Sequence, residues 1–303
     1  MLELAASVWR PTAARWLGWR TRMAVLLSMA IVILGVFVVS VGGLLMWSLY
    51  SGGTIGVGPS GHVTLGNYVR AFTDPLFVGA LWTTLRLSTG ATAASLALGL
   101  PVAYWMVRTR SRRTRAAVII LVAIPFMTSL IVRLYSLTLV LGNTGLINRA
   151  LQELGVIGPN EFLRLIRNEM SVGIGLTYFV LPFVIFTLAG VVRRLDYQLE
   201  EAAQNLGADE VVTFFRVALP LLLPGVVAAG TLAFVLAGTA FVTPLILGGG
   251  AVEMIANSIY DQAMSVQSMP MAATLSAVAL VFTFACLYVG QQLVRERRLA
   301  KAT

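Results

Sequence analysis

Long apolar runs separated by short polar segments dominate the pattern of this sequence. Six runs are long enough for the ~20 residues that a helix needs to cross a bilayer. They cover residues 23–50, 76–107, 116–141, 171–192, 226–247 and 271–294. In lipid, a chain must satisfy its own backbone hydrogen bonds, which favours helices here. The pattern therefore predicts an all-α membrane protein with six transmembrane helices and one membrane domain over residues 23–294.

The two ends of the chain are basic and short. Residues 1–22 mix Arg with Trp, which is typical of a segment at a membrane interface, and residues 295–303 form a basic tail. The run over residues 23–50 is too long for the apolar part of a cleaved signal peptide, so we interpret it as an uncleaved first span. We expect residues 1–22 and 295–303 to be cytoplasmic segments.

Positive charge is distributed unevenly between the polar segments. If residues 1–22 are cytoplasmic, sixteen of the 22 Lys and Arg lie in cytoplasmic segments and four in external ones. The densest group is the five arginines between Arg108 and Arg115. This asymmetry follows the positive-inside rule and predicts that both termini are cytoplasmic. Residues 51–75, 142–170 and 251–270 are then external.

Several prolines fall inside the apolar runs. We expect Pro125 inside the third span and Pro182 to break the fourth, because proline removes one helical hydrogen bond. Pro101 lies inside the second span, and Pro244 lies at the outer end of the fifth. Such breaks are tolerated where neighbouring helices or a water-filled cavity satisfy the freed backbone groups. They are consistent with a passage that opens on alternate sides.

Composition narrows the function classes. The chain is 58% hydrophobic and 12% charged, with a mean hydropathy of +0.85, which is typical of a membrane protein. The net charge of +9 would suit nucleic acid, but the basic residues flank apolar runs, so we expect the lipid bilayer and no nucleic acid as partner. Cys286 is the one cysteine and His62 the one histidine, so we expect no disulfide and no metal site, and we assign His62 no role.

The chain lacks the residues of an enzyme or a nucleotide-binding protein. A phosphate-binding loop needs Gly-Lys-Ser/Thr, but the only lysine, Lys301, is followed by Ala302. No nucleophile and base constellation is evident, so we expect no catalytic activity. A proton-coupled secondary transporter would place Asp, Glu or His inside its spans. Every Asp and Glu lies outside the expected spans, which leaves that class as a remote alternative.

Residues 193–225, between the fourth and fifth spans, are both charged and helical in pattern. The segment 200–206 fits a helix, Gly207 provides a free turn, and Pro220 and Pro224 are expected to end a second helix. One apolar stripe of that second helix comprises Val211, Phe214, Phe215 and Ala218. The pattern predicts a helix, a turn and a second helix at the cytoplasmic membrane surface.

The same segment carries a motif with a specific resemblance. It contains Glu201-Ala202-Ala203, then Gly207 after three residues, then Val217, Leu219 and Pro220. This resembles the EAA loop of permease subunits from bacterial ATP-binding-cassette importers. The family pattern is EAA, three residues, Gly, nine residues, Ile, any residue, Leu-Pro, and the one departure is Val217 for Ile. The resemblance implies a type I importer permease fold in which this loop is the coupling helix.

The resemblance also implies roles for the motif residues and a set of partners. Glu201 is expected to be the polar anchor of the loop, Ala202 and Ala203 to allow a close fit, and Leu219 and Pro220 to join the loop to the fifth span. Expected partners are two cytoplasmic ATPase subunits, a second permease chain in a heterodimer, and an external solute-binding protein. ATP and Mg would bind to the ATPases, and no cofactor to this chain. The expected location is the bacterial inner membrane.

A wider resemblance is to the spermidine/putrescine permease subfamily. It is carried by residues 131–135 (IVRLY), 141–148 (LGNTGLIN) and 181–183 (LPF), and by the turn Gly248-Gly249. It implies a polyamine as the solute. Polyamine permeases tend to carry an acidic residue shortly before that turn, where this chain has residues 243–247, TPLIL. The departure leaves open an opine, an organophosphonate or an amino-acid-like solute.

Two arginines, Arg86 and Arg133, lie inside the apolar runs. An arginine at a helix centre costs roughly 2.5 to 3.5 kcal/mol on insertion scales, so such a residue usually faces a cavity, a partner or the headgroups. A role in the translocation path is one prediction. The equal alternative is a side chain that reaches the headgroup region or pairs with an external carboxylate, Glu169, Glu253 or Asp261. Unpaired, both arginines would repel a dication. Candidate residues of the translocation path are Arg86, Arg133, Tyr135, Tyr178, Phe179, Glu253 and Asp261.

Overall fold

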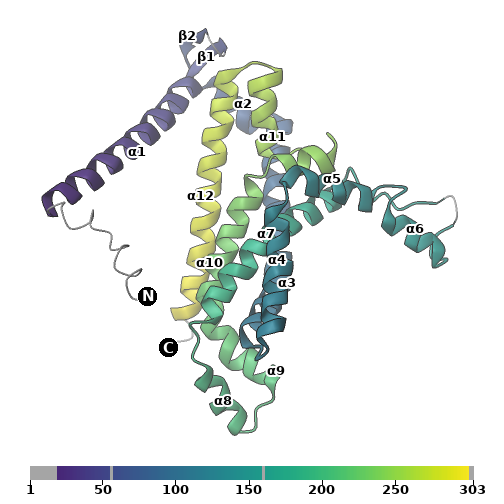
Figure 1. Ribbon diagram of the computed structural model, residues 1–303. Helices are drawn as coiled ribbons and strands as arrows, with labels where there is room; N and C mark the ends of the chain where they lie inside the picture. The colour runs from purple at the N-terminus through teal and green to yellow at the C-terminus, as the bar shows by residue number, and fades with distance from the viewer. Residues whose placement is uncertain (1–18, 55–56, 159–160, 300–303) are drawn as a thin grey trace, which may run out of the picture.

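The computed structural model describes residues 19–54, 57–158 and 161–299 (Figure 1). The predictions for residues 1–18 and 300–303 therefore lie outside the described residues. The elements are α1 (Trp19–Ser48), β1 (Tyr50–Thr54), β2 (Gly58–Val63), α2 (Gly66–Thr73), α3 (Pro75–Arg108), α4 (Arg112–Met127), α5 (Leu130–Leu141), α6 (Leu146–Glu153), α7 (Glu169–Val192), α8 (Tyr197–Asn205), α9 (Glu210–Thr213), the π-helical turn η2 (Phe214–Ala218), α10 (Leu219–Gly238), η3 (Pro244–Gly248), α11 (Ile255–Tyr260), η4 (Asp261–Ser265) and α12 (Met269–Leu299).

The helices α3, α7 and α10 pack together as the centre of a bundle (Figure 1). The buried side of α7 repeats every fourth residue, as expected for one face of a helix. It comprises Val172, Leu176, Val180, Val184 and Leu188. Small residues let the helices approach closely, since Gly99 of α3 contacts α7 at Val184 and Ile185.

A second cluster of buried side chains joins α2, α3, α11 and α12 at the end of the bundle that carries the β-hairpin. Phe77, Leu81, Ile255 and Leu275 form its centre. The Thr84 hydroxyl accepts a hydrogen bond from the Ile255 backbone N–H at 2.8 Å, which attaches α11 to α3. We call this the hairpin end, and the opposite end, at the bottom of Figure 1 with α8 and α9, the loop end.

A two-stranded hairpin follows α1. The strands β1 and β2 pair antiparallel, with Gly53 at a φ of +140° and Gly58 at +97° close to the turn. These conformations favour glycine, which explains the glycine-rich composition of the stretch. The Asn67 amide donates to the carbonyls of Ser48 and Tyr50 and thereby fixes the hairpin to α2. We expected residues 51–75 to be external, but the sequence pattern predicted neither β1 nor β2.

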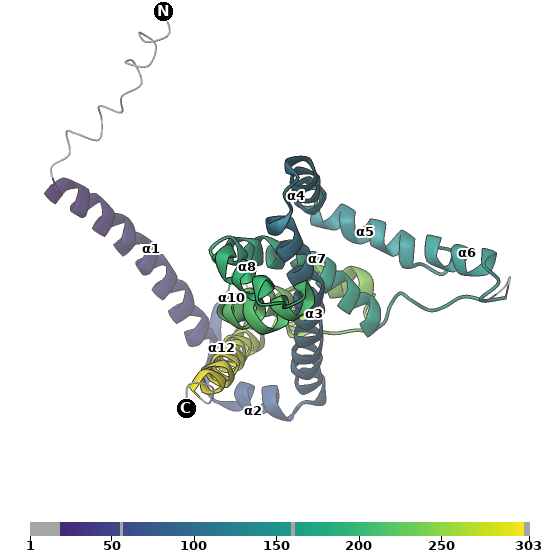
Figure 2. The ribbon, with the colours of Figure 1, turned by 90° about the horizontal axis from the view of Figure 1, so that it is seen from below.

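The first helix, α1, leans away from the bundle (Figures 1 and 2) and exposes apolar side chains on every side. A helix that is apolar all round suits lipid or a partner helix. Among the described residues, six helices are long and apolar enough to cross a membrane: Met23–Ser48, Pro75–Arg108, Leu130–Glu153, Glu169–Val192, Glu210–Gly238 and Met269–Gln292. The prediction of six spans in a mostly helical protein is therefore confirmed.

The third span was predicted wrongly as one helix over residues 116–141. The structure divides it into α4 and α5, which meet at Thr128 and Ser129 in extended conformations with ψ of 146° and 137°. In Figure 2, α5 and α6 run sideways from the end of α4. Pro125 sits in the last turn of α4, where it removes one backbone donor, so the helix ends shortly after it.

Other prolines interrupt the helices less than expected. Pro182 is buried within a continuous α7, so the predicted break of the fourth span is wrong. Pro220 stands where the wider turn η2 passes into α10, which accommodates a residue without an N–H, and Pro224 lies one turn later. Neither proline ends a helix. The fifth helix therefore continues directly from η2 and ends at Gly238 rather than extending over residues 226–247.

Candidate functional site

The segment between α7 and α10 projects from the loop end of the bundle (Figure 1). We call residues 193–218, the part of the predicted segment 193–225 that precedes α10, the docking loop. Its first helix, α8, begins at Asp196, whose carboxylate accepts a hydrogen bond from the Gln198 N–H at 3.0 Å. Gly207 follows with a φ of +88°, and α9 and η2 then lead back to the bundle. The predicted helix, turn and second helix are all present.

The two faces of the docking loop differ in polarity and exposure. Phe214 and Ala218 pack against Val192 and Leu222 of the bundle. Val211 and Phe215 are exposed by 60% and 59%, and Leu206 by 90%. The predicted single stripe of four apolar residues is therefore wrong, because the wider turn η2 changes the angular spacing of side chains. The consequence is an exposed apolar surface at the tip of a charged loop.

The motif residues lie along both arms of the loop. Glu201 and Ala202 are exposed on α8, and Ala203 is half-buried. Gly207 is exposed at the turn, and no neighbouring atom lies within 4 Å of the position its side chain would take. Val217 and Leu219 are half-buried where the loop meets α10, and Pro220 is exposed.

Glu200, next to the motif, is the carboxylate that anchors the loop to the bundle. It is only 2% exposed. Tyr104 donates its hydroxyl proton to Glu200 Oε2 at 2.7 Å, and Arg108 donates to Glu200 Oε1 at 2.5 Å. Sequence reasoning missed this group. Consecutive helical residues point about 100° apart. Of the neighbouring acids Glu200 and Glu201, only one can therefore face the bundle, and this spacing was the signal in the sequence that could have identified the anchor.

At the hairpin end, a polar pocket of about 340 Å³ collects charged side chains from α2, from η4 and from the residues that precede α3 and α11. Arg70, Asp74, Glu253 and Asp261 all line it. The Ser258 hydroxyl donates to Glu253 at 2.7 Å and orients that carboxylate. Two candidates for the translocation path, Glu253 and Asp261, are thus brought together, and three carboxylates face one guanidinium.

A second group of candidates lines a groove of about 580 Å³ between α3 and α7. Arg86 and Tyr178 both face it. Arg86 forms an ion pair with Glu169, the first residue of α7. Pairing with an external carboxylate was one of the two predictions for Arg86, and that ion pair is present; a role in the translocation path stays a prediction, since Arg86 also lines the groove.

The remaining candidates lie apart from both groups. Phe179, on α7, is partly buried against the hydrophobic core, with its ring centroid 5.9 Å from that of Phe183. Tyr135 is exposed on α5. Arg133, also on α5, is half-buried, and its buried Nε atom has no hydrogen-bond partner among the described residues. The seven candidates therefore do not form one continuous site.

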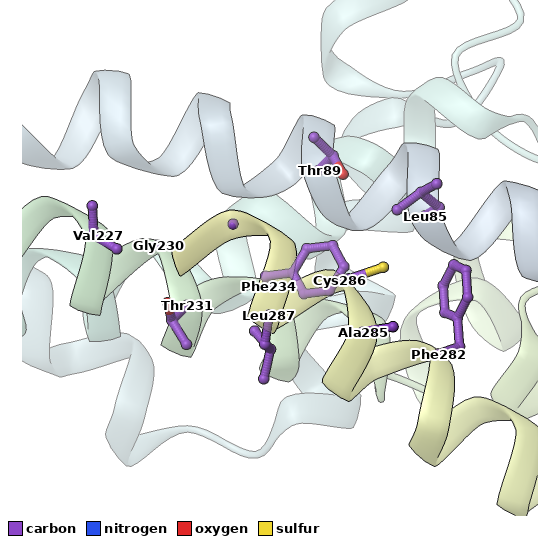
Figure 3. Close-up of a pocket in the computed structure, with 11 residues that line it drawn as sticks. Leu85, Thr89, Val227, Gly230, Thr231, Phe234, Phe282, Ala285, Cys286 and Leu287 are labelled. Carbon is purple, nitrogen blue, oxygen red and sulfur yellow. The ribbon is translucent and has the colours of Figure 1, made fainter. Parts of the chain in front are cut away.

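The open groove between α3, α10 and α12 is apolar. Figure 3 shows its lining, in which Leu85, Phe234, Phe282 and Leu287 surround a volume of about 590 Å³. Cys286 and two threonines supply its few polar atoms. In the described part of the chain, no group of three or more His, Cys, Asp or Glu side chains could hold a metal ion. This groove suits hydrocarbon rather than a charged solute.

Six apolar spans with a projecting helical loop define the class of a membrane transport subunit. A family model described as "Binding-protein-dependent transport system inner membrane component" matches residues 95–300, and the chain belongs to this family. It is a non-catalytic, multi-pass subunit of the inner membrane that binds no cofactor. Solute delivery by a periplasmic binding protein and ATP hydrolysis by a partner ATPase subunit follow from that membership.

Among individual proteins, the chain is similar to permeases of bacterial ABC transporters. The chain is 34% identical over 214 residues to the spermidine/putrescine transport system permease protein PotB of Haemophilus influenzae, covering 71% of this chain and 73% of that protein. It is 34% identical over 230 residues to the inner membrane ABC transporter permease protein YdcU of Escherichia coli K12, covering 73% and 72%.

A solved structure supports the fold. A chain of a bacterial alginate ABC transporter, in complex with a periplasmic protein carrying an alginate pentasaccharide, superposes with a TM-score of 0.75 and 17% identity. The match covers 90% of this chain and 93% of that one. This likeness establishes the ABC importer permease fold and says nothing about the solute.

Proposed function

We propose that this chain is a permease subunit of a polyamine importer and that the docking loop transmits ATP-driven motion to its membrane helices. The observation that supports the coupling role most directly is the exposed apolar tip of the docking loop. Leu206, Val211, Val212 and Phe215 are exposed apolar residues of that tip. Apolar side chains on a charged segment outside the spans indicate a protein partner.

The motif and its geometry suit an ATPase subunit as that partner. Glu201 and Ala202 are free on the outer face of α8, and Gly207 forms the turn that exposes Leu206. We propose that two ATPase subunits serve the complex, one docking on this loop and one on the equivalent loop of a second, different permease chain. Glu201 then contacts the ATPase, while Ala202 and Ala203 allow its close approach.

Three observations support a polyamine as the solute. The relatives include spermidine/putrescine permeases with about one third sequence identity. The ion pair with Glu169 neutralises Arg86, which removes one source of repulsion for a dication. The hairpin-end pocket carries three carboxylates, Asp74, Glu253 and Asp261, against Arg70. Its net negative lining attracts a cationic solute.

Two observations favour an anionic or zwitterionic solute instead. Arg133 is half-buried on α5, and its guanidinium would attract a carboxylate or phosphonate. The stretch 243–247 also lacks an acidic side chain. An opine, an organophosphonate or an amino-acid-like solute is therefore the second candidate.

The test is hydrolysis of ATP by the whole importer. The tagged chain is purified from the membrane in mild detergent with its associated proteins, which are identified by mass. The complex is then reconstituted into liposomes with the binding protein, and ATPase activity is measured with spermidine, putrescine, an opine, an aminophosphonate or an amino acid. We expect co-purified ATPase subunits and a second permease chain, and stimulation by spermidine or putrescine.

The outcomes separate the two parts of the proposal. Stimulation by an anionic or zwitterionic solute alone would overturn the polyamine assignment and leave coupling intact. A variant with Leu206→Ser and Phe215→Ser should lose co-purified ATPase subunits while its membrane level stays unchanged. Full retention of the ATPase by that variant would contradict docking through the loop tip.

A further inference from the structure

The buried anchor at Glu200 connects the docking loop to a helix that is remote in the sequence. The loop is continuous with α7 and α10, but the donors to Glu200 come from α3, 92 and 96 residues earlier. Tyr104 and Arg108 stand four residues apart and therefore lie on the same face of the last two turns of α3.

The C-terminal end of α3 contacts both arms of the docking loop. The Arg108 guanidinium lies 5.1 Å from the ring centroid of Tyr197 on α8 and donates weakly to the Leu195 carbonyl at 3.5 Å. The rings of Tyr104 and Phe214 in η2 pack edge to face, with their centroids 4.9 Å apart. One turn of α3 therefore holds α8 through charge and η2 through an aromatic contact.

The far end of the same helix reaches the polar surfaces of the hairpin end. The helix α3 is continuous from Pro75 to Arg108. Thr84 accepts from the Ile255 N–H, and Arg86 pairs with Glu169. A displacement applied at Arg108 would therefore be carried along a single helix to the groove and to α11.

We propose that Glu200 is a positioning residue that fastens the docking loop to α3, so that loop, α3, α7 and α10 move as one body during transport. This rests on the proposed coupling function of the loop. The exposed neighbour Glu201 contacts the ATPase subunit, and the buried Glu200 transmits the displacement of the loop to α3. Without the anchor, the loop can move on its two covalent connections while α3 stays behind.

The distance between α8 and α3 tests the anchor without any solute. The full chain with Cys286→Ser receives two exposed cysteines, Gln198→Cys on α8 and Arg110→Cys two residues beyond the end of α3, and carries a nitroxide on each. Pulsed electron paramagnetic resonance is recorded on the whole importer, without nucleotide and with trapped ATP. We expect a narrow distance distribution that is equal in both states, and a broad, nucleotide-dependent one after Glu200→Gln. An unchanged narrow distribution in the Glu200→Gln protein would overturn the proposal.

Transport per ATP is the second readout. Glu200→Gln should lower the ratio of radiolabelled spermidine imported to ATP hydrolysed by about tenfold or more, because one member of a buried ion pair is lost. Glu200→Asp should recover part of that ratio, and Arg113→Gln, an exposed charge change on α4, should leave it unchanged. Equal ratios in Glu200→Gln and the parent would contradict the proposal.

The two readouts distinguish this inference from the proposed function. If the parent chain retains no ATPase subunit, the coupling function fails, yet the α8–α3 distance still reports whether Glu200 fixes the loop. If the solute is not a polyamine, spermidine import is absent from every variant while the distance measurement is unaffected. Should Glu200→Gln fail to reach the membrane, Tyr104→Phe removes a single hydrogen bond and should broaden the distribution less; an identical distribution there would count against the anchor.

Discussion

At the scale of single residues, Gly207 shows how backbone geometry constrains the docking loop. Its φ of +88° lies in a region that side-chain-bearing residues rarely adopt. No heavy atom stands within 4 Å of a side chain at this position, so sterics between neighbours do not restrict the substitution. The backbone conformation alone makes glycine necessary there, and the turn presents Leu206 at the tip.

We predict that Gly207→Asp uncouples ATP hydrolysis from transport. The substitution strains the turn by about 1 kcal/mol or more and adds a negative charge beside the apolar tip. The chain should still insert in the membrane, since the turn lies outside the spans. Uptake, measured in cells alongside membrane levels of the chain, should fall at least about fivefold, because about 1.4 kcal/mol corresponds to a factor of ten.

A matched control separates loop function from general backbone strain. Gly155 has a φ of +69° and also has open space around it, but it lies at the end of α6. Gly155→Asp therefore introduces the same side chain under a similar strain at a different place. Uptake close to that of the parent is expected. Normal uptake in Gly207→Asp, or equal loss in both variants, would argue against a coupling role for the turn.

The two ion pairs differ in what they contribute. The side chains of Arg86 and Glu169 are 51% and 46% exposed, so their pair adds at most about 1 kcal/mol to stability. The side chains of Arg108 and Glu200 are 18% and 3% exposed, so removing one partner costs roughly 3 to 5 kcal/mol. The first pair mainly neutralises charge beside a groove, and the second fixes the position of a helix.

At the scale of elements, the contact between α7 and α10 depends on the absence of a side chain at Gly225. A Cβ atom there would lie 2.6 Å from Cγ2 of Val191 and 2.9 Å from its Cβ. A β-branched neighbour in a helix has little rotamer freedom to move aside. The two helices that carry the docking loop therefore approach each other through this glycine.

We predict that Gly225→Ala lowers the thermal stability of the purified chain. The added methyl group must separate α7 from α10 or displace Val191, and overpacking of this kind typically costs about 1 to 3 kcal/mol. Gly190→Ala, on the exposed side of α7 with nothing within 4 Å, should instead be neutral or slightly stabilising. Melting temperatures in detergent check this pair, and a Gly225→Ala protein as stable as the Gly190→Ala protein would refute the packing argument.

The sequence was sufficient for the helices whose apolar runs end at charged or glycine-rich segments. It failed at Thr128 and Ser129, since neither residue breaks a helix by itself and the bend of α5 is a tertiary feature. It overestimated Pro182 and Pro220, because proline effects depend on position within a helix and on neighbouring contacts. It missed Glu200, whose partners lie more than ninety residues away.

At the scale of the whole molecule, the fold gives two chemically different ends. The loop end carries the docking loop and the arginines that follow α3, while the hairpin end carries the acidic pocket. The excess of Lys and Arg in the segments around the loop end supports a cytoplasmic position for it. Cytoplasmic placement of residues 1–22, 193–225 and 295–303 is our proposal for the topology.

We predict that the two ends label from opposite sides of the membrane. In a chain with Cys286→Ser, single cysteines replace Glu153, which is exposed on α6, or Gln198, which is exposed on the docking loop. A membrane-impermeant maleimide added to intact spheroplasts should modify the cysteine at 153 and leave the one at 198 unreacted until the membrane is permeabilised. The reverse pattern would place the docking loop outside, where no cytoplasmic ATPase could reach it, and the coupling role of Glu200 and Gly207 would fail with it.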